Sequence, residues 1–255
     1  MTIRRRDVAL LGGIVALIYG LRALPWAQVF GDAPAFAEIK GLHPFRRLAT
    51  QGAASAPDFA LLGLETPSED GFIRRARAEA VKANLCLALF GPDLPVGVVP
   101  IAYFSEFRCP YCRALERDLE RMLEEDPATF RLIQHELPIF GPTSELAARA
   151  SVAASRQGKQ QELRRRFMRT PLVADDASIM RIAADLGLDH DQLLRDMASS
   201  EVQAELDRTR ALADIFGFVG TPGLVIGRTV LNGAIPYAVL RQIAEDEKSA
   251  AGTLC

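Results

Sequence analysis

The feature that most constrains this chain is a pair of cysteines, Cys109 and Cys112, with two residues between them. An apolar, β-branched and aromatic run over residues 98–104 stands just before the pair and predicts a buried strand. The residues after the pair, to about Glu125, have apolar side chains at helical spacing, which predicts an amphipathic helix. Its charged side chains, Glu116 among them, are expected to face solvent. The two cysteines therefore lie where a strand ends and a helix begins.

This position has a chemical consequence for Cys109. Free backbone N–H groups and the helix dipole at the start of a helix stabilise an anion. We therefore expect Cys109 to have a depressed pKa and to be the exposed nucleophile. Cys112, one turn further and on the buried face, is placed to resolve a mixed disulfide. Pro110 suits the first helical position, and Pro110 with Tyr111 is expected to bind substrate and to set how strongly the thiolate is stabilised.

A zinc site is one alternative interpretation of the pair, and a purely structural disulfide is another. A structural zinc site needs about two ligands beyond the pair. The candidates are isolated along the chain: Cys86, Cys255, His43, His135 and His190. We therefore expect no metal at the pair.

The rest of the chain completes an α/β pattern. Residues 130–137 predict a second strand, and the order strand, helix, strand favours two parallel strands. A helical pattern over about residues 144–216 follows and reads as an insertion of short amphipathic helices. Residues 223–227 and 229–233 then predict two strands joined by a tight turn, before a final helix over 236–248.

A second element of interest is Gly220-Thr221-Pro222, directly before one of these strands. An ordinary turn is one interpretation of it. Considered together with the cysteine pair, a cis Thr221–Pro222 bond is the better one. Such a turn would place the backbone of Thr221 opposite Cys109, where it could pair with an extended substrate peptide.

Residues 103–112, with the sequence YFSEFRCPYC, resemble the active-site segment of DsbA-like thiol–disulfide oxidoreductases. The order of the later pieces is similar too: the segment at 136–139, the helical insertion and the Gly-Thr-Pro turn at 220–222. The resemblance covers about residues 96–244. It implies a thioredoxin fold with a helical insertion domain.

For the site, the resemblance implies Cys109 as nucleophile, Cys112 as resolving cysteine and Pro222 as the cis-proline. It also implies protein thiols or disulfides as substrates, with no bound cofactor. Family members often carry an acidic residue six positions before the first cysteine, and that position here is Tyr103. Glu106 or Glu136 could replace the acid, although Glu106 is expected to be a solvated loop residue.

The N-terminus carries the signal for the compartment. Arginines at 4–6 precede an apolar run over residues 8–21, and a less regular apolar stretch continues to Phe30. The whole stretch would span about 34 Å as a helix, enough for an uncleaved membrane anchor, whereas the shorter run has the length of a signal peptide with a cleavage site near Ala35. Both interpretations export the rest of the chain to the periplasm or another extracytoplasmic space. A buried helix of a soluble protein is the remaining interpretation.

We therefore expect an anchor or signal helix at residues 1–30, a stalk and helical extension at 31–95 and the catalytic domain at 96–255. Residues 31–60 predict irregular structure, and residues 72–89 predict a helix. Cys86 and Cys255 could form a second, structural disulfide. The alternative is a buried free thiol at Cys86 and a frayed C-terminus.

The predicted function is an exported oxidase that introduces disulfides into cysteine-containing proteins and is reoxidised by a membrane partner. A reductase or isomerase kept reduced by a membrane electron donor is the alternative. A membrane-tethered binding or chaperone module that merely retains the cysteines is a third hypothesis. A relative of glutathione transferases is less expected, because that branch typically has a serine where Cys109 stands. The net charge of −2 gives no reason to expect a nucleic-acid partner.

Overall fold

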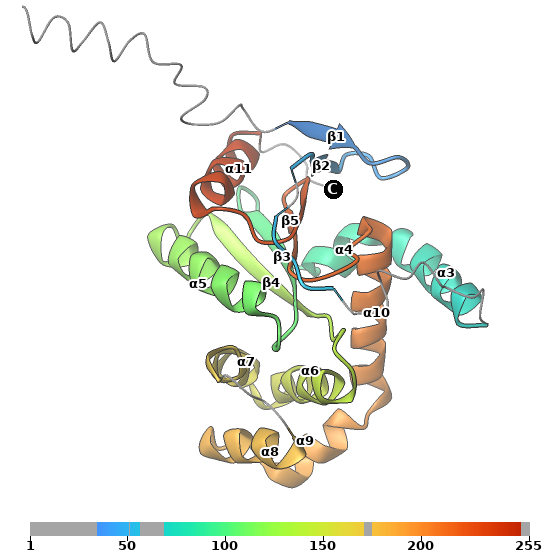
Figure 1. Ribbon diagram of the computed structural model, residues 1–255, viewed down its shortest axis with the longest axis vertical. Coiled ribbons are helices and arrows are strands. Elements are labelled where there is room, and N and C mark those ends of the chain that lie inside the picture. Colours follow the sequence, from blue (N-terminus) through green and yellow to red (C-terminus); the bar gives the residue numbers. More distant parts are fainter. Residues whose placement is uncertain (1–34, 51, 57–68, 171–174, 251–255) are drawn as a thin grey trace, which may run out of the picture. The chain divides into compact units, whose positions relative to one another are not determined.

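The computed structural model describes residues 35–50, 52–56, 69–170 and 175–250. These residues form a mixed six-stranded sheet in the order β1-β2-β6-β5-β3-β4 (Figure 1). The strands are β1 Phe36–Glu38, β2 Arg46–Leu48, β3 Val99–Ser105, β4 Phe130–Glu136, β5 Gly223–Ile226 and β6 Thr229–Asn232. The predicted parallel pairing of β3 with β4 is confirmed, and β5 runs antiparallel to both β3 and β6.

Helices flank this sheet and continue beyond one end of it. They are α3 Glu69–Lys82, α4 Leu85–Phe90, α5 Pro110–Glu125, α6 Pro142–Ala154, α7 Gln160–Arg169, α8 Asp176–Asp185, α9 His190–Met197, α10 Ser200–Phe216 and α11 Tyr237–Ser249. A short 3₁₀ turn, η2 Ser155–Gln157, follows α6. Figure 1 shows α5 and α11 on one face of the sheet, with α4 and α10 on the other.

The central strand β3 is buried over its whole length, so its side chains contribute to two cores. Ile101 and Tyr103 belong to the cluster that α5 and α11 cover. Ala102 and Phe104 belong to the cluster that α4 and α10 cover. This alternation follows from the period of two along a strand. It explains why the strand has a continuous apolar run instead of a polar-apolar alternation.

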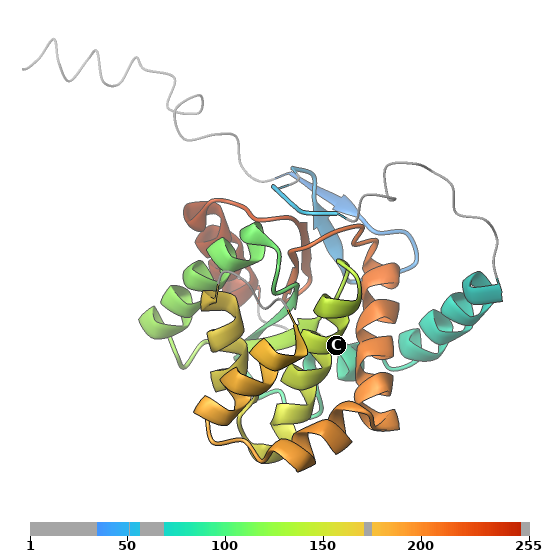
Figure 2. The same ribbon diagram turned by 60° about the horizontal axis from the view of Figure 1, so that its bottom comes forward.

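Between β4 and β5, the regular elements of the described residues are all helices, joined by short loops. Helices α6 to α9 gather at one end of the sheet, and α10 leads back to β5 (Figure 2). The structure thus places helices where the sequence predicts them, over about 144–216. This arrangement brings α7 close to α5, the helix that begins at the cysteine pair.

The region before β3 differs from the prediction. Residues 31–60 predict irregular structure, yet β1 and β2 extend the sheet at its edge, where β2 pairs in parallel with β6. Strands of three residues are too short for a period of two to be visible in the sequence. The single helix predicted over 72–89 is two helices, because the chain turns at Asn84 before α4 packs Leu89 and Phe90 into the core.

The predicted N-terminal anchor or signal helix falls on residues 1–30, which lie outside the described residues. Among the residues that are described, none of the helices is long and apolar enough to cross a membrane.

Candidate active site

Cys109 is the N-cap of α5, so its sulfur lies beside the free amides of the first helical turn. The backbone N–H of Cys112 donates a hydrogen bond to Cys109 Sγ at 3.3 Å. The same sulfur lies 3.4 Å from the carbonyl oxygen of Thr221 and 3.5 Å from Ser55 Oγ. Pro110 occupies the first turn of α5, as expected from its missing N–H. Three segments that are far apart in the sequence therefore meet at one sulfur atom.

These contacts separate the acidities of the two thiols. Hydrogen bonding from Cys112 lowers the pKa of Cys109 to about 5, against the opposing effect of burial, and hydrogen bonds with Ser55 and Thr221 lower it further. For Cys112, burial above all raises the pKa well above its usual range, and the hydrogen bond and charge of Cys109 add to this. Both thiols are free. At neutral pH the arrangement favours a thiolate on Cys109 and a protonated thiol on Cys112.

The expectation that Cys109 is exposed is wrong for this structure, in which the residue is 0% exposed. A short segment at residues 52–56, which we call the strap, lies against the turn that contains Thr221 and brings Ser55 to the sulfur. The sequence contains no signal for this contact, because the strap is a small-residue stretch with no periodicity. By contrast, Pro110 and Tyr111 are exposed beside the buried pair, Tyr111 at 40%.

The turn before β5 has the predicted form, since the peptide bond between Thr221 and Pro222 is cis. Thr221 is buried, and its backbone lies opposite Cys109, as expected. The substrate-binding position predicted for its backbone is occupied by the strap: Ser55 N–H donates to the Thr221 carbonyl at 2.8 Å, and Thr221 N–H donates to the Ser55 carbonyl at 2.8 Å.

The position of the family acid holds a tyrosine, as noted above. Tyr103 is fully buried, and its hydroxyl donates a hydrogen bond to the carbonyl oxygen of Cys112 at 2.9 Å. Burial raises the pKa of Tyr103 well above its usual value, so the hydroxyl keeps its proton. This side chain holds the first turn of α5 and leaves no carboxyl group at that position.

Glu106 does not have the solvated position expected for it. It is 2% exposed, and its two carboxylate oxygens accept hydrogen bonds from the backbone amides of Arg108 at 3.0 Å and Ile139 at 2.9 Å. Burial raises its pKa despite these bonds. The carboxylate thus ties the loop before Cys109 to the loop after β4.

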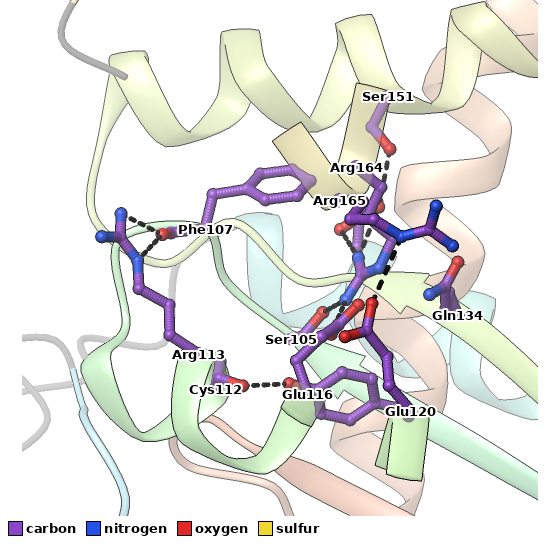
Figure 3. A network of polar contacts seen from close by, with 12 residues as sticks. Ser105, Phe107, Cys112, Arg113, Glu116, Glu120, Gln134, Ser151, Arg164 and Arg165 are labelled. Carbon is purple, nitrogen blue, oxygen red and sulfur yellow. Dashed lines mark hydrogen bonds and ion pairs between the residues drawn. The ribbon is translucent and has the colours of Figure 1, made fainter. Parts of the chain in front are cut away.

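A buried polar cluster lies behind the first turn of α5 (Figure 3), and residue spacing did not single it out. Its centre is Arg164 of α7, which is 0% exposed. One guanidinium nitrogen lies 2.7 Å from both carboxylate oxygens of Glu136, and the other donates to Glu116 at 2.9 Å and to Ser105 at 2.6 Å. Ser151 donates a further hydrogen bond to Glu136 at 2.7 Å.

This cluster corrects one expectation and shows the surroundings of a second carboxylate. Glu116, expected to face solvent, is only 7% exposed, because Arg164 neutralises it inside the fold. Glu136, a candidate to replace the family acid, is engaged in a buried ion pair with Arg164 at 2.7 Å. A signal for Arg164 did exist, since it stands between Leu163 and Phe167 on the apolar face of a predicted helix.

The remaining candidate residues lie elsewhere. Cys86 in α4 is disulfide-bonded, and its predicted partner Cys255 lies outside the described residues. His135 in β4 is buried, places Nε2 2.9 Å from the carbonyl oxygen of Leu89 and stacks on Phe104. Within the described part of the chain, no group of three or more His, Cys, Asp or Glu side chains is placed to hold a metal ion.

A mixed α/β fold with a cysteine pair at a strand–helix junction and a facing cis-proline defines the class of thioredoxin-like thiol–disulfide oxidoreductases. The family model described as "DSBA-like thioredoxin domain" matches residues 100–244, more than half of the chain. The chain belongs to this family and is a DsbA-like thiol–disulfide oxidoreductase.

Solved structures agree with this assignment. A thioredoxin-like oxidoreductase from Silicibacter pomeroyi is 35% identical, with a TM-score of 0.60 over 65% of this chain and 98% of that one. A periplasmic thioredoxin-like protein from Salmonella enterica shares the fold, at 23% identity and a TM-score of 0.56 over 65% of this chain and 97% of that one.

A curated relative of a different description also matches part of the chain. The Na(+)/H(+) antiporter NhaA 3 of Salinispora tropica is 29% identical over 152 residues, or 58% of this chain. The match spans only 22% of that antiporter's length.

Proposed function

We propose that Cys109 and Cys112 are the working redox pair and that the protein acts as an oxidase, introducing disulfides into cysteine-containing proteins. The observation that carries the proposal is the position of Cys109 Sγ at the start of α5, where it accepts a hydrogen bond from the Cys112 amide and where hydrogen bonding lowers the pKa of Cys109 to about 5. A thiolate stabilised to this degree favours the reduced enzyme over its disulfide. The oxidised enzyme is therefore a strong acceptor of electrons from substrate thiols.

The reaction takes two exchanges. A substrate thiolate attacks Cys109 of the oxidised enzyme, so that a mixed disulfide forms and the Cys109–Cys112 bond breaks. Cys112 leaves with the electron pair and takes up a proton, because its pKa is raised. A second substrate thiolate then attacks the substrate sulfur of the mixed disulfide and releases Cys109 as a thiolate. The substrate gains a disulfide, and the enzyme retains the two electrons.

The redox potential of the pair tests the direction of this reaction. The full chain would be equilibrated in glutathione buffers and trapped, and each cysteine would be assigned by mass spectrometry. We expect a potential near the oxidising end of the range, about −120 mV. A value near about −270 mV would identify the alternative, a reductase or isomerase kept reduced by a membrane electron donor. A pair that does not cycle would refute both functions.

We also propose that the catalytic part works outside the cytoplasm, with residues 1–30 as an inner-membrane anchor or a cleaved signal and a membrane partner as reoxidant. The basic residues before the apolar run support this orientation, and the Salmonella relative is described as periplasmic. The division at residues 30 and 95 belongs to the same proposal. N-terminal sequencing of the mature protein distinguishes an anchor from a cleaved signal.

A further inference from the structure

We propose that the strap, residues 52–56, is an internal substrate mimic. It occupies the peptide site beside Cys109, and a protein substrate binds by replacing it, extended and antiparallel to Thr221, with its cysteine at the position of Ser55. The inference rests on the proposed role of Cys109 as the nucleophile. It adds an occupant for the site and an orientation for the substrate.

The first support is the backbone pairing at Thr221. Ser55 and Thr221 exchange two hydrogen bonds, both of 2.8 Å, in an antiparallel bridge. These are the donor and acceptor through which an extended peptide adds to an exposed backbone edge. Because the strap uses both groups of Thr221, a substrate cannot form this pairing until the strap leaves.

The second support is the side chain presented to the nucleophile. Ser55 Oγ lies 3.5 Å from Cys109 Sγ. Serine differs from cysteine in its γ atom alone, so a cysteine at this position of a bound peptide would put its sulfur next to Cys109. A hydroxyl there cannot form the disulfide, but it hydrogen-bonds to the sulfur and contributes to the low pKa of Cys109. The strap therefore holds the nucleophile in a protected state.

The third support is that backbone contacts hold the strap in place. Ala53 and Ala234 exchange hydrogen bonds of 3.1 and 2.7 Å, and Gly52 N–H donates to Asn232 at 2.7 Å. A Cβ on Gly220 would meet the Ser55 carbonyl oxygen at 2.3 Å, and one on Gly52 would meet the carbonyl oxygen of Ala234 at 2.2 Å.

The side chains of the strap contribute little to its binding. Ala53, Ala54 and Ala56 are exposed, and the strap is held mainly by backbone hydrogen bonds. Backbone bonds are available to any extended peptide, and pockets for side chains are what would supply specificity. The site that the strap occupies therefore fits unfolded cysteine-containing polypeptides of varied sequence. The strap can leave it without exposing the hydrophobic core.

A cross-link tests the placement of the strap. In the full chain with Cys112→Ser, the added substitution Ser55→Cys supplies a thiol beside Cys109. Oxidised glutathione first forms a mixed disulfide on Cys109; the thiolate at position 55 attacks it, forms the 55–109 disulfide and releases glutathione as a thiolate. We expect this cross-link to dominate in the mass spectrum, whereas Ala54→Cys in the same background gives mainly glutathione adducts. Equal cross-linking at 54 and 55, or none at 55, would overturn the placement.

Accessibility tests the inhibition. Gly52→Ala forces the strap away from Ala234, and Ser55 and both cysteines keep their side chains. At pH 8, where Cys109 is already a thiolate, alkylation of the reduced protein by iodoacetamide is expected to rise about tenfold, the effect of losing one or two backbone hydrogen bonds. The KM for a cysteine-containing peptide should fall to a similar extent with kcat unchanged, because a larger fraction of the enzyme is competent to bind. The exposed substitution Ala54→Ser should change neither quantity.

Unchanged alkylation and KM in Gly52→Ala would contradict the inhibitory role. The two proposals also fail separately. Cross-linking through position 55 needs added glutathione but no turnover, so it reports on the strap even if the cysteine pair does not cycle. A pair that cycles without cross-linking at position 55 would leave the proposed function standing and remove the substrate mimic.

Discussion

The backbone amide of Cys112 donates a hydrogen bond of 3.3 Å to the sulfur of Cys109, the residue that caps the same helix. The bond links two cysteines whose thiols have opposite character. The pKa of Cys109 is lowered to about 5 by its hydrogen bonds, whereas burial raises the pKa of Cys112 well above its usual range. One cysteine is thus prepared to attack or leave as an anion, and the other is prepared to hold a proton.

The first prediction concerns this thiolate. In the reduced protein, thiolate absorbance near 240 nm should titrate with a midpoint of about pH 5. Because the folded pKa lies below the unfolded value of about 8.5, the thiolate stabilises the reduced fold fully above pH ~8.5 and loses this effect as the pH falls through about 5. Cys109→Ser should abolish this transition. Cys112→Ala should keep it with a higher midpoint, since the side-chain hydrogen bond of Cys112 makes the largest contribution to the lowered pKa and alanine cannot replace it.

The second prediction concerns the order of attack. With a protein substrate that carries a disulfide, reduced Cys112→Ser should accumulate a mixed disulfide at Cys109. The Cys109 thiolate opens the substrate disulfide and one substrate sulfur leaves as a thiolate, but the Cys112 thiol that would then attack Cys109 and release the substrate is missing. Cys109→Ser should accumulate none, since Cys112 is buried and protonated. Non-reducing electrophoresis with mass spectrometry provides the measurement. Equal trapping by both variants would contradict the assignment of the two roles.

The third prediction concerns the buried ion cluster. Arg164→Met would leave the carboxylates of Glu116 and Glu136 buried without their cation. Removing one partner of a buried pair costs about 3–5 kcal/mol of unfolding free energy. The matched control is Arg165→Met, an exposed neighbour paired with Glu120 at 3.3 Å, for which we expect a change below about 1 kcal/mol. Urea unfolding measures both, and similar losses would show that the cluster adds little.

The fourth prediction concerns His135. Burial lowers its pKa from 6.5 to about 4, so the native state keeps the ring neutral where the unfolded chain takes up a proton. Its contribution to stability is present above pH ~6.5 and is lost as the pH falls toward 4, by about 2 kcal/mol at pH 5. Unfolding free energies at pH 7.5 and 5 should therefore differ less in His135→Phe than in the unsubstituted protein. An equal difference in the two proteins would show that groups other than His135 cause the pH dependence.

The fifth prediction concerns the second disulfide. Peptide mapping under non-reducing conditions should join Cys86 to Cys255. Cys86→Ser should then lower the free energy of unfolding by about 2–4 kcal/mol, because the bond restricts the unfolded chain. The redox behaviour of Cys109 and Cys112 should not change. Recovery of Cys255 as a free thiol would refute the pairing.

Much of the site could be predicted from local sequence. The lowered pKa of Cys109 was predicted from its position at the start of a helix. The cis bond before Pro222 was predicted from the Gly-Thr-Pro turn before a strand, considered together with the cysteine pair. The parallel pairing of β3 and β4 follows from the order strand, helix, strand, and the helices between β4 and β5 follow from periodicities within single segments. Spacing reports such features well, because they depend on neighbours within one or two turns of the chain.

Contacts between distant segments could not be predicted in this way. Ser55 reaches Cys109 across 54 positions, and Arg164 reaches Ser105 across 59. Neither the strap nor the strands β1 and β2 have a hydrophobic periodicity of their own. Glu106 and Glu116 are of a residue type that is usually exposed.

The sequence by itself therefore determined the chemistry of this protein: a cysteine pair at the start of a helix, a facing cis-proline and an α/β scaffold. The tertiary structure alone decided what surrounds the pair. Arg164 forms ion pairs with two buried carboxylates behind the cysteine pair, and the strap covers Cys109 by pairing with Thr221. The physical reason is that burial and backbone pairing depend on which segments pack together, and a local pattern does not record its distant partner.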